Sequence, residues 1–189
     1  MGFNLNFIDN QKMKKIVLVV ITAFMTTTIG LSSAMAAEEG GYGLLSIGFS
    51  PLTDPTGTMS GYGVEVGGGY NFNKYFGTEA IIGALGLSAG SAYNPLSFSI
   101  SVAGHLPLTD GFGIYGKVGE AETMVTLNST NGGASQGYSG VTGLYGVGVE
   151  FYTADHADFR IGYDHYDLSV IPGWPMSTNY INITRTAYF

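Results

Sequence analysis

Apolar and polar residues alternate with a period of two along most of the chain beyond residue 40. In the segment 61–72, tyrosine, valine and phenylalanine fall on one face, whereas glycine, Glu65 and Asn71 fall on the other. The same period recurs in 96–106 and in 141–151. Successive side chains of a β-strand point to opposite faces, and no window repeats with the spacing of a helix. The pattern therefore predicts strands.

The pattern predicts eight strands, most of them about 10 to 12 residues long. They are expected at 41–50, 60–72, 76–87, 96–106, 112–127, 140–153, 158–169 and 179–189. All six prolines are expected in the connections, because proline cannot donate a hydrogen bond to a strand ladder. Short turns are expected at 73–75, 107–111 and 154–157, and longer loops rich in small polar residues at 50–59, 88–95, 128–139 and 170–178.

Short turns at one end and longer loops at the other are typical of a membrane barrel. A soluble sandwich or lipocalin-like barrel also alternates, but its outer face carries charged residues. Here the apolar face is large and the other face is small and polar. Aromatic residues gather at the strand ends, as they do at membrane interfaces, and those expected toward the long loops are Tyr62, Tyr93, Tyr138 and Tyr180. The sequence predicts an all-β fold, an eight-stranded antiparallel up-and-down transmembrane β-barrel.

The composition narrows the function classes. The 189 residues include 30 glycines, 13 tyrosines, 11 phenylalanines and no cysteine, and 11% are charged. So little charge beside so many aromatic residues excludes a disordered chain, and the absence of cysteine excludes disulfides and thiolate metal sites. Seven Lys and Arg against fourteen Asp and Glu leave no basic surface for a nucleic acid.

The start of the chain has the parts of a secretory signal peptide. Lys14 and Lys15 precede an apolar stretch at 16–31, and small residues follow up to Ala36. A membrane anchor is the weaker alternative, because a spanning helix needs about 20 apolar residues. We predict a signal peptide at 1–36, with Met13 as an alternative start of translation, and a mature barrel at 37–189.

Four segments carry a resemblance to a known family. They are GGGYNFNKYFGTEA at 67–80, LYGVGVEF at 144–151, FRIGYDHYD at 159–167 and the terminal Phe189. Together they resemble the outer membrane protein A-like β-barrel domain family of small eight-stranded outer membrane proteins. The chain departs from the family pattern at Ala187, where an aromatic residue is usual.

The resemblance implies an integral protein of the Gram-negative outer membrane, with a structural or surface-interaction role and no enzymatic activity. Its implied partners are outer-membrane lipids, including lipopolysaccharide, and the barrel assembly machinery, which would engage the C-terminal strand ending in Phe189. A monomer is expected, and no nucleic acid partner or cofactor.

If the aromatic-rich face meets lipid, six charged residues face the lumen. They are Glu65, Glu79, Lys117, Glu150, Arg160 and Asp164. The interior of an eight-stranded barrel is just wide enough for side chains, and isolated buried charges are costly, so we expect a network of ion pairs that plugs the lumen. The alternative is a network that rearranges to open a small, low-conductance pore. By the same alternation, Glu120, Glu122 and Arg185 face outward.

Two further features are candidates for chemistry or contact. His165, Asp167 and Ser169 suggest a lipid A-modifying enzyme, but Ser169 lies about 13 Å along the strand from His165, which is too far for proton transfer. No metal site or catalytic residue is predicted. Trp174 lies in a long loop, where it is expected either to contact a partner or to rest at the level of the lipid headgroups.

Overall fold

The computed structural model describes residues 39–88, 93–127, 136–153 and 157–189. The predicted signal peptide at 1–36 therefore lies outside the described residues. Within the described part, ten strands form one antiparallel sheet. No helix in this part of the chain is long and apolar enough to cross a bilayer.

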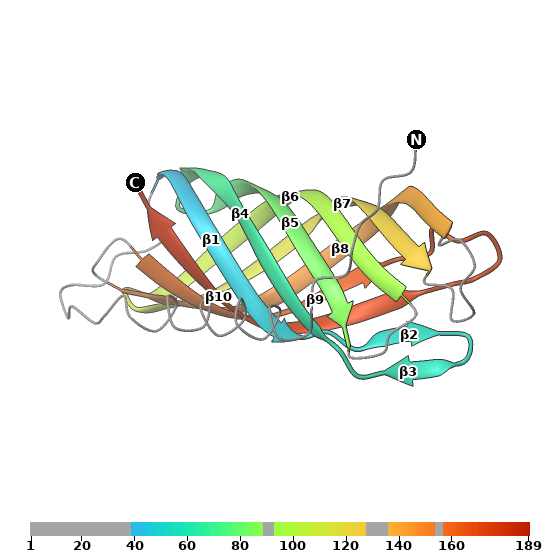
Figure 1. Ribbon diagram of the computed structural model, residues 1–189. Helices are drawn as coiled ribbons and strands as arrows, with labels where there is room; N and C mark the ends of the chain where they lie inside the picture. Colours follow the sequence, from blue (N-terminus) through green and yellow to red (C-terminus); the bar gives the residue numbers. More distant parts are fainter. Residues whose placement is uncertain (1–38, 89–92, 128–135, 154–156) are drawn as a thin grey trace. The chain divides into compact units, whose positions relative to one another are not determined.

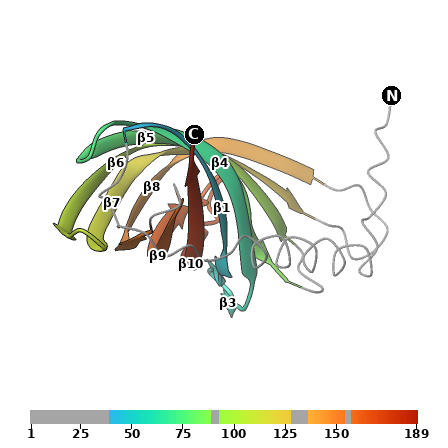
Figure 2. The same cartoon turned by 90° about the vertical axis from the view of Figure 1, so that its left-hand side faces the viewer.

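Eight of the ten strands close into a barrel (Figures 1 and 2). In chain order they are β1 (Gly40–Phe49), β4 (Tyr62–Asn73), β5 (Phe76–Leu87), β6 (Tyr93–Thr109), β7 (Phe112–Leu127), β8 (Gln136–Tyr152), β9 (Ala157–Asp167) and β10 (Ser177–Tyr188). Each strand pairs with the next, and β10 returns to pair with β1 from Tyr42–Tyr188 to Phe49–Ile181. This pairing removes the sheet edges and confirms the predicted antiparallel up-and-down barrel.

The other two strands form a small hairpin at the long-loop end, where the sequence predicts only a loop. β2 (Leu52–Asp54) pairs with β3 (Gly57–Met59) and with the first residues of β10. The carboxylate of Asp54 accepts the N–H groups of Thr56 and Gly57 at 2.7 and 3.2 Å, which closes the turn. Strands of three residues are too short to show a period of two, so the pattern could not reveal them.

The expectation that every proline lies in a connection is wrong for Pro95 and Pro107. Both lie within β6 and pair with Val125 and Gly113 of β7. The opposite edge of β6 pairs with β5 only from Leu96 to Gly104. Because β6 extends past β5 at both ends, the missing N–H of each proline leaves no ladder bond unmade on that side.

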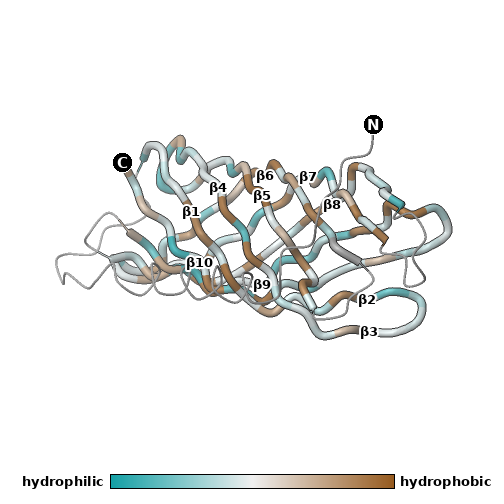
Figure 3. Tube along the Cα trace, in the orientation of Figure 1, coloured by the Kyte–Doolittle hydropathy of each residue, from teal (hydrophilic) through white to brown (hydrophobic). Residues whose placement is uncertain are grey.

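The barrel wall separates an apolar outer face from a buried inner face. Val66, Val118 and Val147 are 56%, 65% and 60% exposed on the outer face, and Figure 3 shows the brown apolar positions alternating with paler ones along the strands. Tyr62 lies on this face near the long loops, as predicted. Tyr180 does not, because it shares the inner face with Asn182 and is fully buried; its expected place in the outer aromatic girdle is corrected.

Candidate functional site

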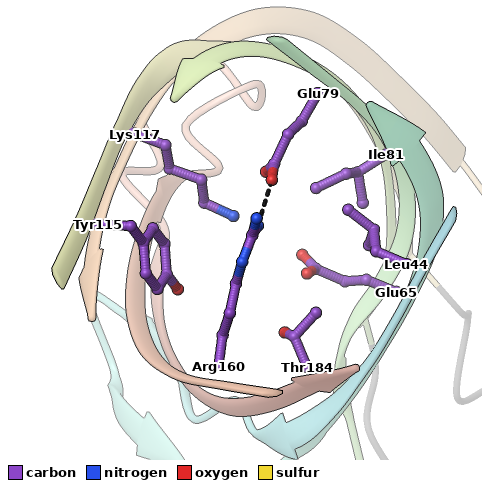
Figure 4. A pocket seen from close by; sticks show the side chains of 8 residues that line it. All are labelled: Leu44, Glu65, Glu79, Ile81, Tyr115, Lys117, Arg160 and Thr184. Carbon is purple, nitrogen blue, oxygen red and sulfur yellow. Dashed lines mark hydrogen bonds and ion pairs between the residues drawn. The ribbon is translucent and has the colours of Figure 1, made fainter. Parts of the chain in front are cut away.

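The structure brings the six predicted lumen residues together inside the barrel. They come from five different strands, β4, β5, β7, β8 and β9, and each is at most 8% exposed. Figure 4 shows Glu65, Glu79, Lys117 and Arg160 pointing toward one another across the lumen. Glu120 and Glu122 lie on the outer face.

Arg160 of β9 forms the centre of the network. Its Nη1 lies 2.5 Å from Oε1 of Glu79, and its Nε lies 2.9 Å from Oε1 of Glu150. Its guanidinium carbon also lies 5.5 Å from the centre of the Tyr42 ring and 5.2 Å from that of Tyr115, so the cation is held between two aromatic faces. One cation thus pairs with carboxylates from β5 and β8, two strands that are not neighbours in the sheet.

Lys117 forms the second ion pair, separate from that of Arg160. Its Nζ lies 3.0 Å from Oδ2 of Asp164. The same oxygen accepts a hydrogen bond of 2.8 Å from Nδ2 of Asn182. The fourth carboxylate, Glu65, accepts the hydroxyl of Tyr166 at 2.5 Å. Each carboxylate of the network therefore has a donor from another strand, which is what burial of a charge requires.

His105 and several tyrosines belong to the network, although the sequence did not assign them to it. Nδ1 of His105 lies 2.9 Å from Oε1 of Glu150, and the histidine is 4% exposed. The hydroxyls of Tyr42 and Tyr152 donate to Glu79 and Glu150 at 2.9 and 3.1 Å. Their signal in the sequence is position, because each falls on the face of its strand that alternation assigns to the lumen.

Glycines on the inner face make room for the tyrosines. Gly148 and Gly162 face each other on β8 and β9, and the Tyr115 ring covers them. A Cβ added at Gly148 would lie 2.6 Å from Cε1 of Tyr115 and would also collide with the carbonyl oxygen of Ile161. Some of the glycines are therefore explained by packing, because the Tyr115 ring lies so close to the barrel wall that no side chain fits at these positions.

A second, apolar layer fills the lumen at the long-loop end, and we refer to it as the cap. It consists of the buried residues Leu52, Leu85, Ala121, Val125, Leu144, Tyr166, Leu168, Met176 and Tyr180, with Met59, Val170, Ile171 and Trp174 packed against them. The β2–β3 hairpin and the segment 168–176 contribute to it, so the loops fold inward over the mouth. Tyr166 belongs to both layers, because its hydroxyl reaches Glu65.

Trp174 packs against the cap rather than standing free on a loop. The Trp174 N–H donates to the carbonyl of Ile171 at 3.0 Å in a tight turn, and the indole Nε1 is buried without a hydrogen-bond partner among the described residues.

Little space remains between the side chains of the network. A cavity of about 10 Å³ lies among them, lined by Leu44, Glu65, Glu79, Ile81, Tyr115, Lys117, Arg160 and Thr184 (Figure 4). That volume is at the lower limit of what one water molecule needs, about 10–15 Å³.

The outer-face residues His165 and Ser169 do not form a catalytic pair. Nδ1 of His165 lies 2.8 Å from Oδ1 of Asn179, and its ring stacks on Tyr145 at 4.9 Å. The Ser169 hydroxyl instead donates to the carbonyl of Met176 at 3.1 Å. A serine nucleophile needs a base within hydrogen-bond reach, and His165 has another partner.

A closed antiparallel barrel with an apolar outer face and a polar, buried interior is the architecture of a transmembrane β-barrel. The family described as outer membrane protein beta-barrel domain matches residues 20–187 of the chain. The chain belongs to this family, which confirms the resemblance to the small eight-stranded outer membrane proteins. No curated protein sequence matches the chain.

Solved structures show the same fold at low sequence identity. Neisserial surface protein A (NspA) superposes with a TM-score of 0.68 at 12% identity, covering 80% of this chain and 98% of that one. The N-terminal β-barrel domain of Pseudomonas aeruginosa OprF gives 0.56 at 13%, covering 80% and 98%. Ail, the attachment invasion locus protein of Yersinia pestis, in complex with the heparin analogue sucrose octasulfate gives 0.54 at 15%, covering 79% and 99%.

Proposed function

We propose that this protein is a closed outer-membrane barrel with a structural or surface-interaction role, and that its lumen does not conduct. The observation that carries this proposal is that the lumen is filled twice, by the charge network and by the apolar cap. The charged residues of the network pair with one another and the apolar residues of the cap pack together, so the interior resembles a protein core.

The energetics of the network support a closed lumen. To clear a path, Arg160 would have to leave both Glu79 and Glu150. Breaking a buried ion pair by losing one partner costs about 3–5 kcal/mol. The alternative, a low-conductance pore, rests on the four carboxylates of the network, which outnumber its Lys and Arg and would favour cations along any path that opened.

Conductance across a planar bilayer tests the proposal. We expect the purified barrel to insert and remain silent in 1 M KCl, with insertion verified by protection from added protease. A steady, reproducible cation conductance in the same preparation would refute the closed lumen and favour the pore.

The loops restrict the chemistry of a surface partner. All seven Lys and Arg of the sequence lie outside the long connections between the barrel strands, which are 50–61, 88–92, 128–135 and 168–176. Polyanions are bound by clusters of basic side chains, so we propose that this barrel does not share a sulfated ligand such as the heparin analogue in the Ail complex. We propose an uncharged or cationic surface partner instead, and binding to immobilised heparin at physiological salt would contradict this.

The enzyme alternative is tested on the membrane itself. The Ser169 hydroxyl is engaged by a backbone carbonyl, and His165 by Asn179, which supports the proposal that the protein does not modify lipid A. Mass spectra of lipid A from cells with and without the protein should be identical. A deacylated species that requires the protein would overturn this.

We also propose that the chain is exported by a signal peptide cleaved after Ala36 and inserted as a monomer through the assembly machinery, which would engage the strand ending in Phe189. The exposed ring of Phe189 supports this proposal, because it stands on the surface at the end of β10. N-terminal sequencing should give Ala37, and the protein should fractionate with outer membranes and run faster on gels when unheated. Recovery from the soluble periplasm would contradict the location.

A further inference from the structure

Arg185 is a cation on the bilayer-facing surface of the barrel. It lies on β10, in register with Leu45 of β1 and Phe159 of β9. Its guanidinium carbon lies 5.9 Å from the centre of the Phe159 ring. Its Nε is buried, yet it has no hydrogen-bond partner among the described residues.

Among the described residues, no carboxylate forms an ion pair with Arg185. Its neighbours on the outer face include Leu45, Phe159 and Ile183, all apolar. The nearest acid in the sequence of β9, Asp158, points to the inner face and accepts the hydroxyl of Tyr188 at 2.8 Å. Among the described residues, the alternation of the strand therefore places the carboxylate on the wrong side of the wall to reach the guanidinium.

The position of Arg185 lies close to one edge of the membrane. Tyr188, the last residue of β10, lies three positions further along the strand, at the barrel end that carries the short turns. With a rise of about 3.3 Å per residue and a tilt near 45°, this is about 7 Å along the membrane normal. An arginine side chain spans such a distance by snorkelling, and Ala187, the next outward residue toward the end, leaves the way open.

We propose that Arg185 binds the phosphate of a phospholipid in the leaflet at the short-turn end of the barrel. A guanidinium presents paired N–H donors whose geometry fits phosphate oxygens, and the lipid phosphates are the anions that this surface meets. The Phe159 ring holds the guanidinium against the wall from one side. The remaining donors face the headgroups, and the acyl chains lie along the apolar strands above.

The sequence makes this proposal directly measurable, because Arg160 and Arg185 are the only arginines in it. Protein labelled with ¹³C,¹⁵N-arginine gives two guanidinium carbon signals, one buried in the lumen and one on the outer face. Arg185→Lys assigns them by removing one. In phosphatidylglycerol vesicles and phosphate-free buffer, ¹³C–³¹P dipolar dephasing should affect the Arg185 signal, since a bound phosphate places phosphorus about 4 Å from the guanidinium carbon.

Arg160 is the internal control, and its signal should show no dephasing. If Arg185→Lys fails to fold, paramagnetic relaxation from lipid-anchored gadolinium assigns the outer signal instead. No dephasing of Arg185 in the folded protein would overturn the proposal. Dephasing that appears in phosphate-free detergent micelles on adding inorganic phosphate would show a site for the free ion, and would overturn the assignment to a lipid.

A stability readout separates binding from structure. The parent should melt at a lower temperature in phosphate-free galactolipid vesicles than in phosphatidylglycerol vesicles, and Arg185→Met should lose most of that difference. Ile183→Met, which changes a neighbouring outward side chain without altering charge, should keep it. An unchanged difference in Arg185→Met would also refute phosphate binding.

Discussion

Replacing Lys117 by methionine tests whether the charge network stabilises the barrel. The substitution keeps most of the side-chain volume and removes the cation that lies 3.0 Å from Asp164. Asp164 keeps its hydrogen bond from Asn182, so it is left with one neutral donor. Loss of one partner of a buried pair costs about 3–5 kcal/mol, and we expect a value near the lower limit because of that remaining bond.

Urea unfolding in phospholipid vesicles measures this loss. Lys74→Met is the matched control, because Lys74 is exposed in a turn, where its Nζ lies 5.0 Å from the centre of the Tyr75 ring; we expect it to lose less than about 1 kcal/mol. Adding Asp164→Asn to Lys117→Met removes the orphaned charge and should recover much of the stability. If the free energy of unfolding of Lys117→Met lies within about 1 kcal/mol of the parent value, Lys117 does not stabilise the network.

Two further predictions concern β8, each with a control on the same strand. Val147→Arg places a charge on the outer face and should lose about 2–4 kcal/mol of unfolding free energy in vesicles. Thr142→Arg should lose far less, because Thr142 is a partly exposed inner-face residue near the long-loop end of the strand; equal losses would mean that the assignment of the two faces is wrong. Gly148→Ala forces a Cβ against Tyr115 and the carbonyl oxygen of Ile161 and should lose about 1–3 kcal/mol. Gly143→Ala meets nothing within 4 Å and should melt like the parent, so similar melting of the two variants would show that both the Tyr115 ring and the β9 backbone adapt.

The sequence predicts the barrel well because lipid and lumen impose opposite polarity on alternate residues. In a strand such as 141–151, valine must face the lipid and glycine or Glu150 must face the lumen. This alternation can be recognised in the sequence alone. The inward positions of Glu65 and Arg160 follow from the same parity. The ion pairs that the inward residues form cannot be predicted in this way. They join strands that are not neighbours in the sheet, and alternation says nothing about which side chains meet across the lumen.

The cap could not be predicted for a different reason. Its members Leu52 and Met176 lie in connections without a regular period, and they join a core only because these two connections pack against inner-face residues of the strands. Trp174 illustrates the difficulty, because a tryptophan in a loop between two prolines is compatible with a surface contact as much as with a place in a core. In the structure it is partly buried and packs against the cap.

The charge network and the cap lie one after the other along the lumen. This arrangement determines how a single substitution affects conductance. The resistance of a path is the sum of its segments, so the more closed layer governs conductance. Lys117→Met loosens the network, but the cap around Leu144 depends on burial of apolar surface and is untouched by a missing charge. We therefore expect Lys117→Met to be less stable and still nearly silent. Conductance should appear only when a polar substitution such as Leu144→Asn weakens the cap as well, and conduction by Lys117→Met alone would mean that the cap does not seal the barrel.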